Sequence, residues 1–118
     1  MTDNRKYNIY QDIVELSDVE LQKKRWLSND SEEISSYEEL MCSFFDDNNI
    51  IDFIDSELAG YSSSSELKKS LQKLVTALNE FDDNGFDNEQ ILNSRPWNKI
   101  ISIAGEVRVL WENELPVN

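Results

Sequence analysis

Apolar residues recur at helical spacing along most of the chain. The clearest stretch follows Ser63-Ser64-Ser65-Glu66, where Ser63 and Glu66 have the spacing of a capping box. The apolar positions beyond it fall at i, i+4, i+7, i+8 and i+11, which is one stripe of an amphipathic helix. These positions are Leu67, Leu71, Leu74, Val75 and Leu78.

A second strong helix is predicted from Pro96 to Asn113. Ser94 can cap it, Pro96 suits its first turn, and Pro116 follows its end. Its apolar face is wide, which predicts a central and largely buried helix. The face comprises Trp97, Ile100, Ile101, Ala104, Val107 and Trp111, with Ile103 and Leu110 at its margins.

The first half of the chain reads as shorter helices. One is expected from Tyr7 to Leu16, and a second is expected after the capping-box spacing of Ser17 and Glu20. After a polar loop at 28–36, Ser36-Tyr37-Glu38-Glu39 opens a third helix. Asn48-Asn49 separates this helix from a further one over 50–58, and Asp87 caps a short helix that ends at Leu92. The pattern predicts an all-α fold, a compact bundle of six or seven helices that forms one domain over residues 1–118, with residues 1–6 frayed.

Composition narrows the class of protein. The chain has 118 residues, which is a length typical of one domain. No apolar run approaches the roughly 18 residues of a membrane-spanning helix, and the first residues lack the apolar stretch of a signal peptide. Cys42 is the single cysteine and cannot form an internal disulfide, which fits a reducing compartment. We therefore expect a cytoplasmic domain.

Charge and missing residue types exclude most functions. With 24 acidic and 11 basic side chains and no histidine, the net charge is −13, which disfavours nucleic acid and membrane partners and favours basic ones. Without histidine, Ser-His-Asp and Cys-His catalysis are impossible, and a zinc site has a poor set of ligands. Three glycines provide no phosphate-binding loop. We expect no enzyme activity, cofactor, metal or small-molecule substrate, although a hydrolase that uses Asp46 and Asp47 stays formally open.

The negative charge is concentrated in one tract. Between Trp26 and Leu67 there is no Lys or Arg but there are eleven carboxylates, which account for −11 of the −13. Such a run is either a solvated face or a surface for a basic partner, and segregation of the signs favours the partner. The predicted pool of partner-binding residues is Asp30, Glu32, Glu33, Glu38, Glu39, Asp46, Asp47, Asp52, Asp55 and Glu57.

Two segments carry the tetrapeptide Phe-Asp-Asp-Asn, at 45–48 and at 81–84, although their flanks do not align. In the first, Asp46 and Asp47 either cap the following helix or face a partner directly. The second resembles the start of a calcium loop, but Asp87 and Ile91 break the pattern at the eighth and twelfth positions. Gly85 is instead expected to provide a left-handed turn.

Short motifs spread over nearly the whole chain suggest a family. They are Leu16-Ser17-Asp18, Leu21-Gln22-Lys23-Lys24-Arg25-Trp26-Leu27, Phe44-Phe45-Asp46-Asp47, Ala59-Gly60 and Ser94-Arg95-Pro96-Trp97 with Ala104 and Leu110. Together they resemble small acidic bacterial immunity proteins of contact-dependent growth inhibition and related polymorphic toxin systems. The resemblance implies a cytoplasmic protein that binds a cognate toxin domain, often a nuclease acting on tRNA, and inhibits it by occlusion.

The expected function is therefore that of a protein that neutralises a basic toxin domain of the ribonuclease (tRNase) type. The physical reading agrees, because an RNA-cleaving surface needs Lys and Arg that an acidic protein can cover. The alternative is a non-inhibitory acidic helical adaptor or chaperone for a basic protein partner.

Overall fold

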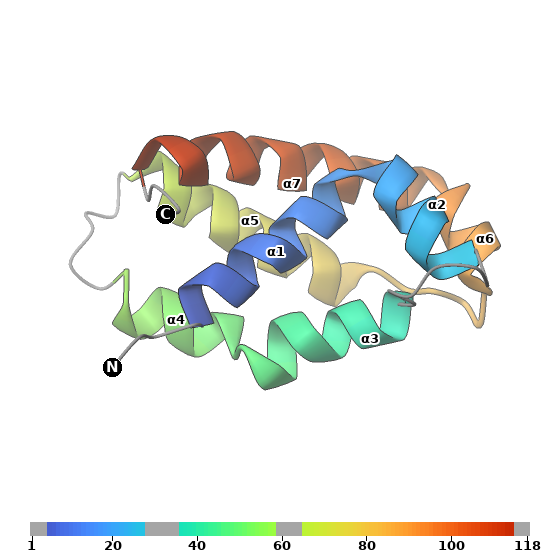
Figure 1. Ribbon diagram of the computed structural model, residues 1–118, viewed down its shortest axis with the longest axis horizontal. Helices are drawn as coiled ribbons and strands as arrows, with labels where there is room; N and C mark the ends of the chain where they lie inside the picture. Colours follow the sequence, from blue (N-terminus) through green and yellow to red (C-terminus); the bar gives the residue numbers. More distant parts are fainter. Residues whose placement is uncertain (1–4, 28–35, 59–64, 115–118) are drawn as a thin grey trace.

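The computed structural model describes residues 5–27, 36–58 and 65–114. Every regular element in these ranges is helical, which confirms the predicted all-α fold (Figure 1). The elements are α1 (Arg5–Ser17), α2 (Val19–Leu27), α3 (Tyr37–Met41), the π-helix η1 (Cys42–Asp47), α4 (Ile50–Ser56), α5 (Glu66–Glu80), α6 (Asn88–Leu92) and α7 (Arg95–Glu114).

The core lies where the first and last helices meet. α1 packs mainly on α7, and α7 also packs on α5. The prediction that α7 is central and largely buried is wrong, because α7 runs along one side of the bundle (Figure 1) and ten of its 20 residues are exposed. In Figure 1, α1 crosses between α7 and the α3–α4 layer. The three tryptophans are buried: Trp26 lies against Trp97 with ring centroids 5.8 Å apart, and Trp111 stacks on Phe53 at 5.6 Å. Their predicted place in the core is confirmed.

Several helix starts agree with the capping residues expected from the sequence. Ser36 caps α3 by accepting from the Glu39 amide at 3.1 Å, and Asp87 forms a capping box with Gln90 at the start of α6. Ser94 accepts from the Trp97 amide at the start of α7. A side-chain oxygen at each N-cap satisfies an amide that has no partner within the helix.

Two predicted caps are wrong. The cap of α5 is Ser65, which accepts from the Lys68 amide, and Ser63 lies outside the described residues. At α2 the cap is Asp18, whose carboxylate accepts from the Leu21 amide at 3.1 Å, whereas the Ser17 hydroxyl donates to the Val14 carbonyl. In the second case the two candidates are adjacent, and Ser17 is still part of α1.

A buried polar network joins α1, α2 and α7. The Gln22 amide is fully buried and donates to the carbonyls of Glu15 and Leu16 at 2.7 and 3.0 Å, while its oxygen accepts from Trp97 Nε1 at 2.9 Å. The buried Glu15 carboxylate accepts from Arg25 at 2.6 Å and from Trp26 Nε1 at 3.0 Å. These bonds fix the turn between α1 and α2 against the start of α7.

The described helices were also compared with the dimensions of a bilayer. None of them combines the length and the apolar character that crossing a membrane requires. Even the longest, α7 with 20 residues, has charged side chains along it.

Replacing Gln22 by leucine tests the network. Gln22→Leu has a similar volume but leaves Trp97 Nε1 without its hydrogen-bond partner and removes the side-chain donor from the carbonyls of Glu15 and Leu16, so we expect a loss of about 2–4 kcal/mol in the free energy of unfolding. Urea unfolding followed by far-UV circular dichroism measures it. Gln11→Leu, the same change at an exposed position of α1, should stay within about 0.5 kcal/mol. Equal stability of the two variants would contradict the assigned role of Gln22.

Candidate partner-binding surface

The acidic tract becomes one edge of the bundle. α3, η1 and α4 follow one another along the side of the molecule opposite α7 (Figure 1). Their apolar side chains point inward, with Leu40, Phe44, Ile50, Phe53 and Ile54 all buried. The carboxylates of the same helices are therefore left on the outer side.

All of the predicted partner-binding residues that the structure describes are exposed. They are Glu38, Glu39, Asp46, Asp47, Asp52, Asp55 and Glu57, and we call them the acidic face. Asp30, Glu32 and Glu33 lie outside the described residues. The described members of the predicted pool thus lie on three consecutive elements or, for Glu57, directly after the third.

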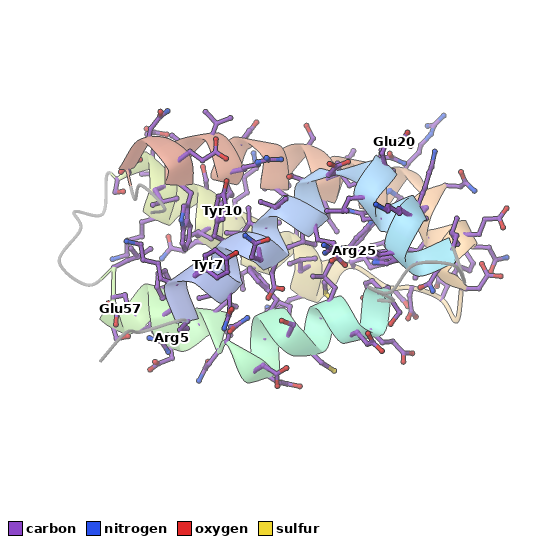
Figure 2. The ribbon with its side chains drawn as sticks, viewed as in Figure 1. Arg5, Tyr7, Tyr10, Glu20, Arg25 and Glu57 are labelled. Atoms are coloured by element: carbon purple, nitrogen blue, oxygen red, sulfur yellow. The ribbon has the colours of Figure 1, made fainter. Side chains whose placement is uncertain are left out.

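Arg5 neutralises one end of the acidic face. Its guanidinium contacts Asp52 at 2.8 Å and lies 3.7 Å from Glu57, and it also sits 5.5 Å from the centre of the Phe53 ring. Figure 2 shows Arg5 and Glu57 at the same end of the molecule. The tract contains no basic residue, but in the folded protein Arg5 of α1 lies beside it. Within the described part of the chain, Glu38, Glu39, Asp46, Asp47 and Asp55 have no ion pair.

The middle of the acidic face is a π-helix. The Asn48 amide bonds to the Ser43 carbonyl at 2.9 Å, five residues back, and Asn49 then adopts a left-handed conformation with φ of 45°. Asn49 caps α4 through the Asp52 amide, so the expectation that Asp46 or Asp47 caps this helix is wrong. The predicted break at Asn48-Asn49 is confirmed. The two aspartates are free to face solvent.

Between α1 and the π-helix lies a partly buried polar cluster that sequence reasoning missed. Asp12 of α1 accepts hydrogen bonds from Ser43 Oγ and from Asn48 Nδ2, each at 2.9 Å. Burial raises the pKa of Asp12 to about 6, against the lowering effect of the bonds from Ser43 and Asn48, and the carboxylates of Glu15 and Asp47 raise it further. The signal in the sequence was an aspartate inside the apolar stripe of Ile9, Ile13 and Leu16.

A second group of carboxylates extends the acidic face. The Tyr37 amide donates to Asn88 Oδ1 at 3.3 Å, which places the start of α3 beside α6 and the turn at 82–87. Burial raises the pKa of the Tyr37 hydroxyl first, and then the charges of Asp83, Asp82 and Glu38 raise it. The second Phe-Asp-Asp-Asn segment therefore contributes to the same surface as α3, which lies at least 40 residues earlier in the chain.

The turn itself has the left-handed conformation that was expected. Asn84 and Gly85 have φ of 54° and 74°, and their amides bond to the carboxylates of Asp82 and Asp83. Among the described residues, no group of three or more acidic or cysteine side chains is placed to hold a metal ion. The chemistry that this surface offers is recognition of cationic groups.

The titration of Asp12 can be measured as a difference between variants. Because its pKa rises from 3.8 to about 6 on folding, the folded state binds a proton more tightly than the unfolded state, and stability falls as pH rises through this window. Asp12→Asn removes that fall, so the variant should gain about 2–3 kcal/mol relative to the unmodified chain between pH 3.5 and pH 7. Urea midpoints across this range measure the gain.

The comparison needs a control because many other carboxylates titrate in the same range. Gln11→Leu, next to Asp12 but without an ionisable group, should run parallel to the unmodified chain at every pH. If Asp12→Asn also runs parallel, folding does not raise the pKa of Asp12.

The chain was also compared with known proteins. Searches against protein-family models, curated proteins and solved structures found no match. The functional assignment below therefore rests on the charge, exposure and geometry of the acidic face together with the sequence motifs.

Proposed function

We propose that this chain is an immunity-type protein that binds and neutralises a basic toxin domain through its acidic face. The expected toxin is a nuclease, with tRNA as its expected substrate. The single observation that carries the proposal is the set of exposed carboxylates on α3, η1 and α4 that have no cationic partner among the described residues. The resemblance of the sequence motifs to immunity proteins supplies the class of partner.

The electrostatic argument concerns both stability and association. Exposed carboxylates on one face repel each other, and a basic partner removes that repulsion when it binds. The same field accelerates the encounter, because oppositely charged surfaces attract one another over about 10 Å at 0.1 M salt. An acidic face on rigid helices therefore favours fast capture of a basic domain.

Inhibition by this face requires no chemistry from the chain itself. A nuclease positions phosphates with Lys and Arg side chains, and these are the groups that a carboxylate surface attracts. A protein seated on them excludes the nucleic acid by occupying its place. The proposed mechanism is occlusion, and the carboxylates act as competing anions.

Affinity needs an apolar contact as well as charge. Ile51 is 51% exposed and lies on α4 beside Asp52 and near Asp55. An exposed large apolar side chain within a charged rim is the arrangement found at protein interfaces, where the apolar centre contributes most of the binding energy. Ile51, an exposed apolar side chain on the same helix as Asp52 and Asp55, is the residue to which we assign this role.

The direct test is co-expression with the protein encoded immediately upstream of this chain, where an immunity gene is expected to follow its toxin. We expect growth rescue, recovery of a complex and loss of nuclease activity in vitro. Binding without inhibition would favour the adaptor alternative, and absence of both rescue and complex would contradict the proposal.

A pair of charge reversals tests the surface. Asp46→Lys with Asp47→Lys should weaken toxin binding at least tenfold and reduce its dependence on salt, since two attractive contacts become repulsive. Glu106→Lys with Glu114→Lys on α7 changes the net charge equally, at exposed positions on the opposite side of the bundle. Titration calorimetry at several salt concentrations compares the two double variants. If both weaken binding equally, only the net charge matters and the acidic face is not the interface.

A further inference from the structure

A small cavity lies where the start of α3 meets the turn before α6. Its volume is about 260 Å³. Its apolar lining residues are Tyr37, Phe86 and Ile91, and its acidic lining residues are Glu38, Asp83 and Asp87. This volume is below the roughly 300–1,000 Å³ of small-molecule pockets, and it suits a single side chain.

The aromatic walls of the cavity are held in place from behind. The Tyr37 ring packs edge-on against Phe81 and Trp97, with centroids 5.7 and 5.5 Å away, so it cannot turn out of the wall. Phe86 is 39% exposed although it is a large apolar residue. The cavity is thus lined by one ring that is packed against the core and one ring that is exposed, and aromatic rings are groups on which a cation can stack.

The carboxylates at the cavity retain capacity to accept hydrogen bonds. Glu38 has no hydrogen bond or ion pair from its side chain within the described residues. Asp83 and Asp87 each use one oxygen locally, on the amides of Gly85 and Gln90. A carboxylate has about four acceptor positions in total, so both can still accept from a ligand. The occupant that complements this rim is a cation.

We propose that this cavity receives an arginine side chain of the basic protein partner, a proposal that rests on the function proposed above. A guanidinium is flat, stacks on aromatic rings and forks its N–H groups toward carboxylates, which matches both walls of the cavity. Its aliphatic stem would lie against the apolar residues. The cavity is thus an anchor at the end of the acidic face farthest from Arg5.

The cavity can be tested without the toxin. The probe is the peptide acetyl-Gly-Arg-Gly-amide, titrated into the ¹⁵N-labelled full chain at low salt, with acetyl-Gly-citrulline-Gly-amide as its neutral isostere. We expect shifts of the Tyr37, Gly85 and Phe86 amides with the arginine peptide alone. Equal shifts with citrulline, or shifts spread evenly over the acidic face, would overturn the proposal. Calcium chloride that shifts the same amides at lower concentration would also overturn it, because the site would then belong to a metal.

Matched variants make the test specific. Glu38→Gln removes a charge at the cavity, whereas Glu39→Gln removes the same charge from the next residue, which does not line it. Glu38→Gln and Phe86→Leu should each raise the Kd of the arginine peptide about tenfold, roughly the loss of one charge-assisted contact. Glu39→Gln should change this Kd less than about twofold. Equal effects of the two glutamine variants would overturn the proposal.

Experiments with the toxin distinguish failure of the arginine anchor from failure of the proposed function. If the chain inhibits the toxin and Glu38→Gln inhibits equally well, the proposed function stands and the anchor is wrong. If no toxin is bound but the arginine peptide still shifts the cavity amides, the cavity is a cation receptor and the proposed function is wrong.

Discussion

The acidic face depends on the hydrogen bonds that Asp12 accepts from Ser43 and Asn48. Carboxylates on α3, η1 and α4 repel one another, and this layer must be held against the bundle from inside. Burial of the apolar stripe of these helices provides most of the stabilisation, but hydrophobic burial is not directional. The Asp12 cluster fixes the orientation of the layer, because the buried Asn48 amide and the partly buried Ser43 hydroxyl are satisfied only when they meet the Asp12 carboxylate.

The same cluster accounts for the irregular shape of the layer. Asn48 is buried, although asparagine is usually exposed, because its side-chain amide reaches Asp12 and also lies 3.3 Å from Ser43 Oγ. The wide turn of η1 precedes it, and the left-handed Asn49 follows it. A regular α-helix through this segment would rotate the side chains differently, so burial of Phe44 and outward placement of Asp46 and Asp47 go together with the π-helix.

Much of the fold follows from local patterns, and much of the site does not. Helix positions could be predicted because the apolar period and the caps at Ser36, Asp87 and Ser94 act within a few residues. The errors at α2 and α5 are choices between neighbouring capping residues, which tertiary packing decides. The π-helix has no comparable local signature, and its polar partner is 31 residues away in α1.

For the surface, the exposure of the described acids could be predicted from the sequence, since they lie outside the apolar stripes of their helices. Two contacts of this surface could not be predicted. Arg5 reaches Asp52 across 47 residues, and the turn at 82–87 meets α3 through a bond that spans 51. A count of charges along the sequence therefore misses the Arg5 cation at one end of the acidic face and the carboxylates of the turn at 82–87 at the other end.

The pairing of α1 with α7 has a consequence for how the chain is made. The first helix buries Ile9, Ile13 and Leu16 against the last long helix, about ninety residues later. Contacts this distant in sequence are slow to form, because a long loop must close before they contribute. During synthesis the apolar side of α1 cannot be buried against α7 until α7 has left the ribosome. A chain truncated within α7 would lose the surface that α1 and α5 pack against, and the layer of α3, η1 and α4 would then lack a complete core to pack on.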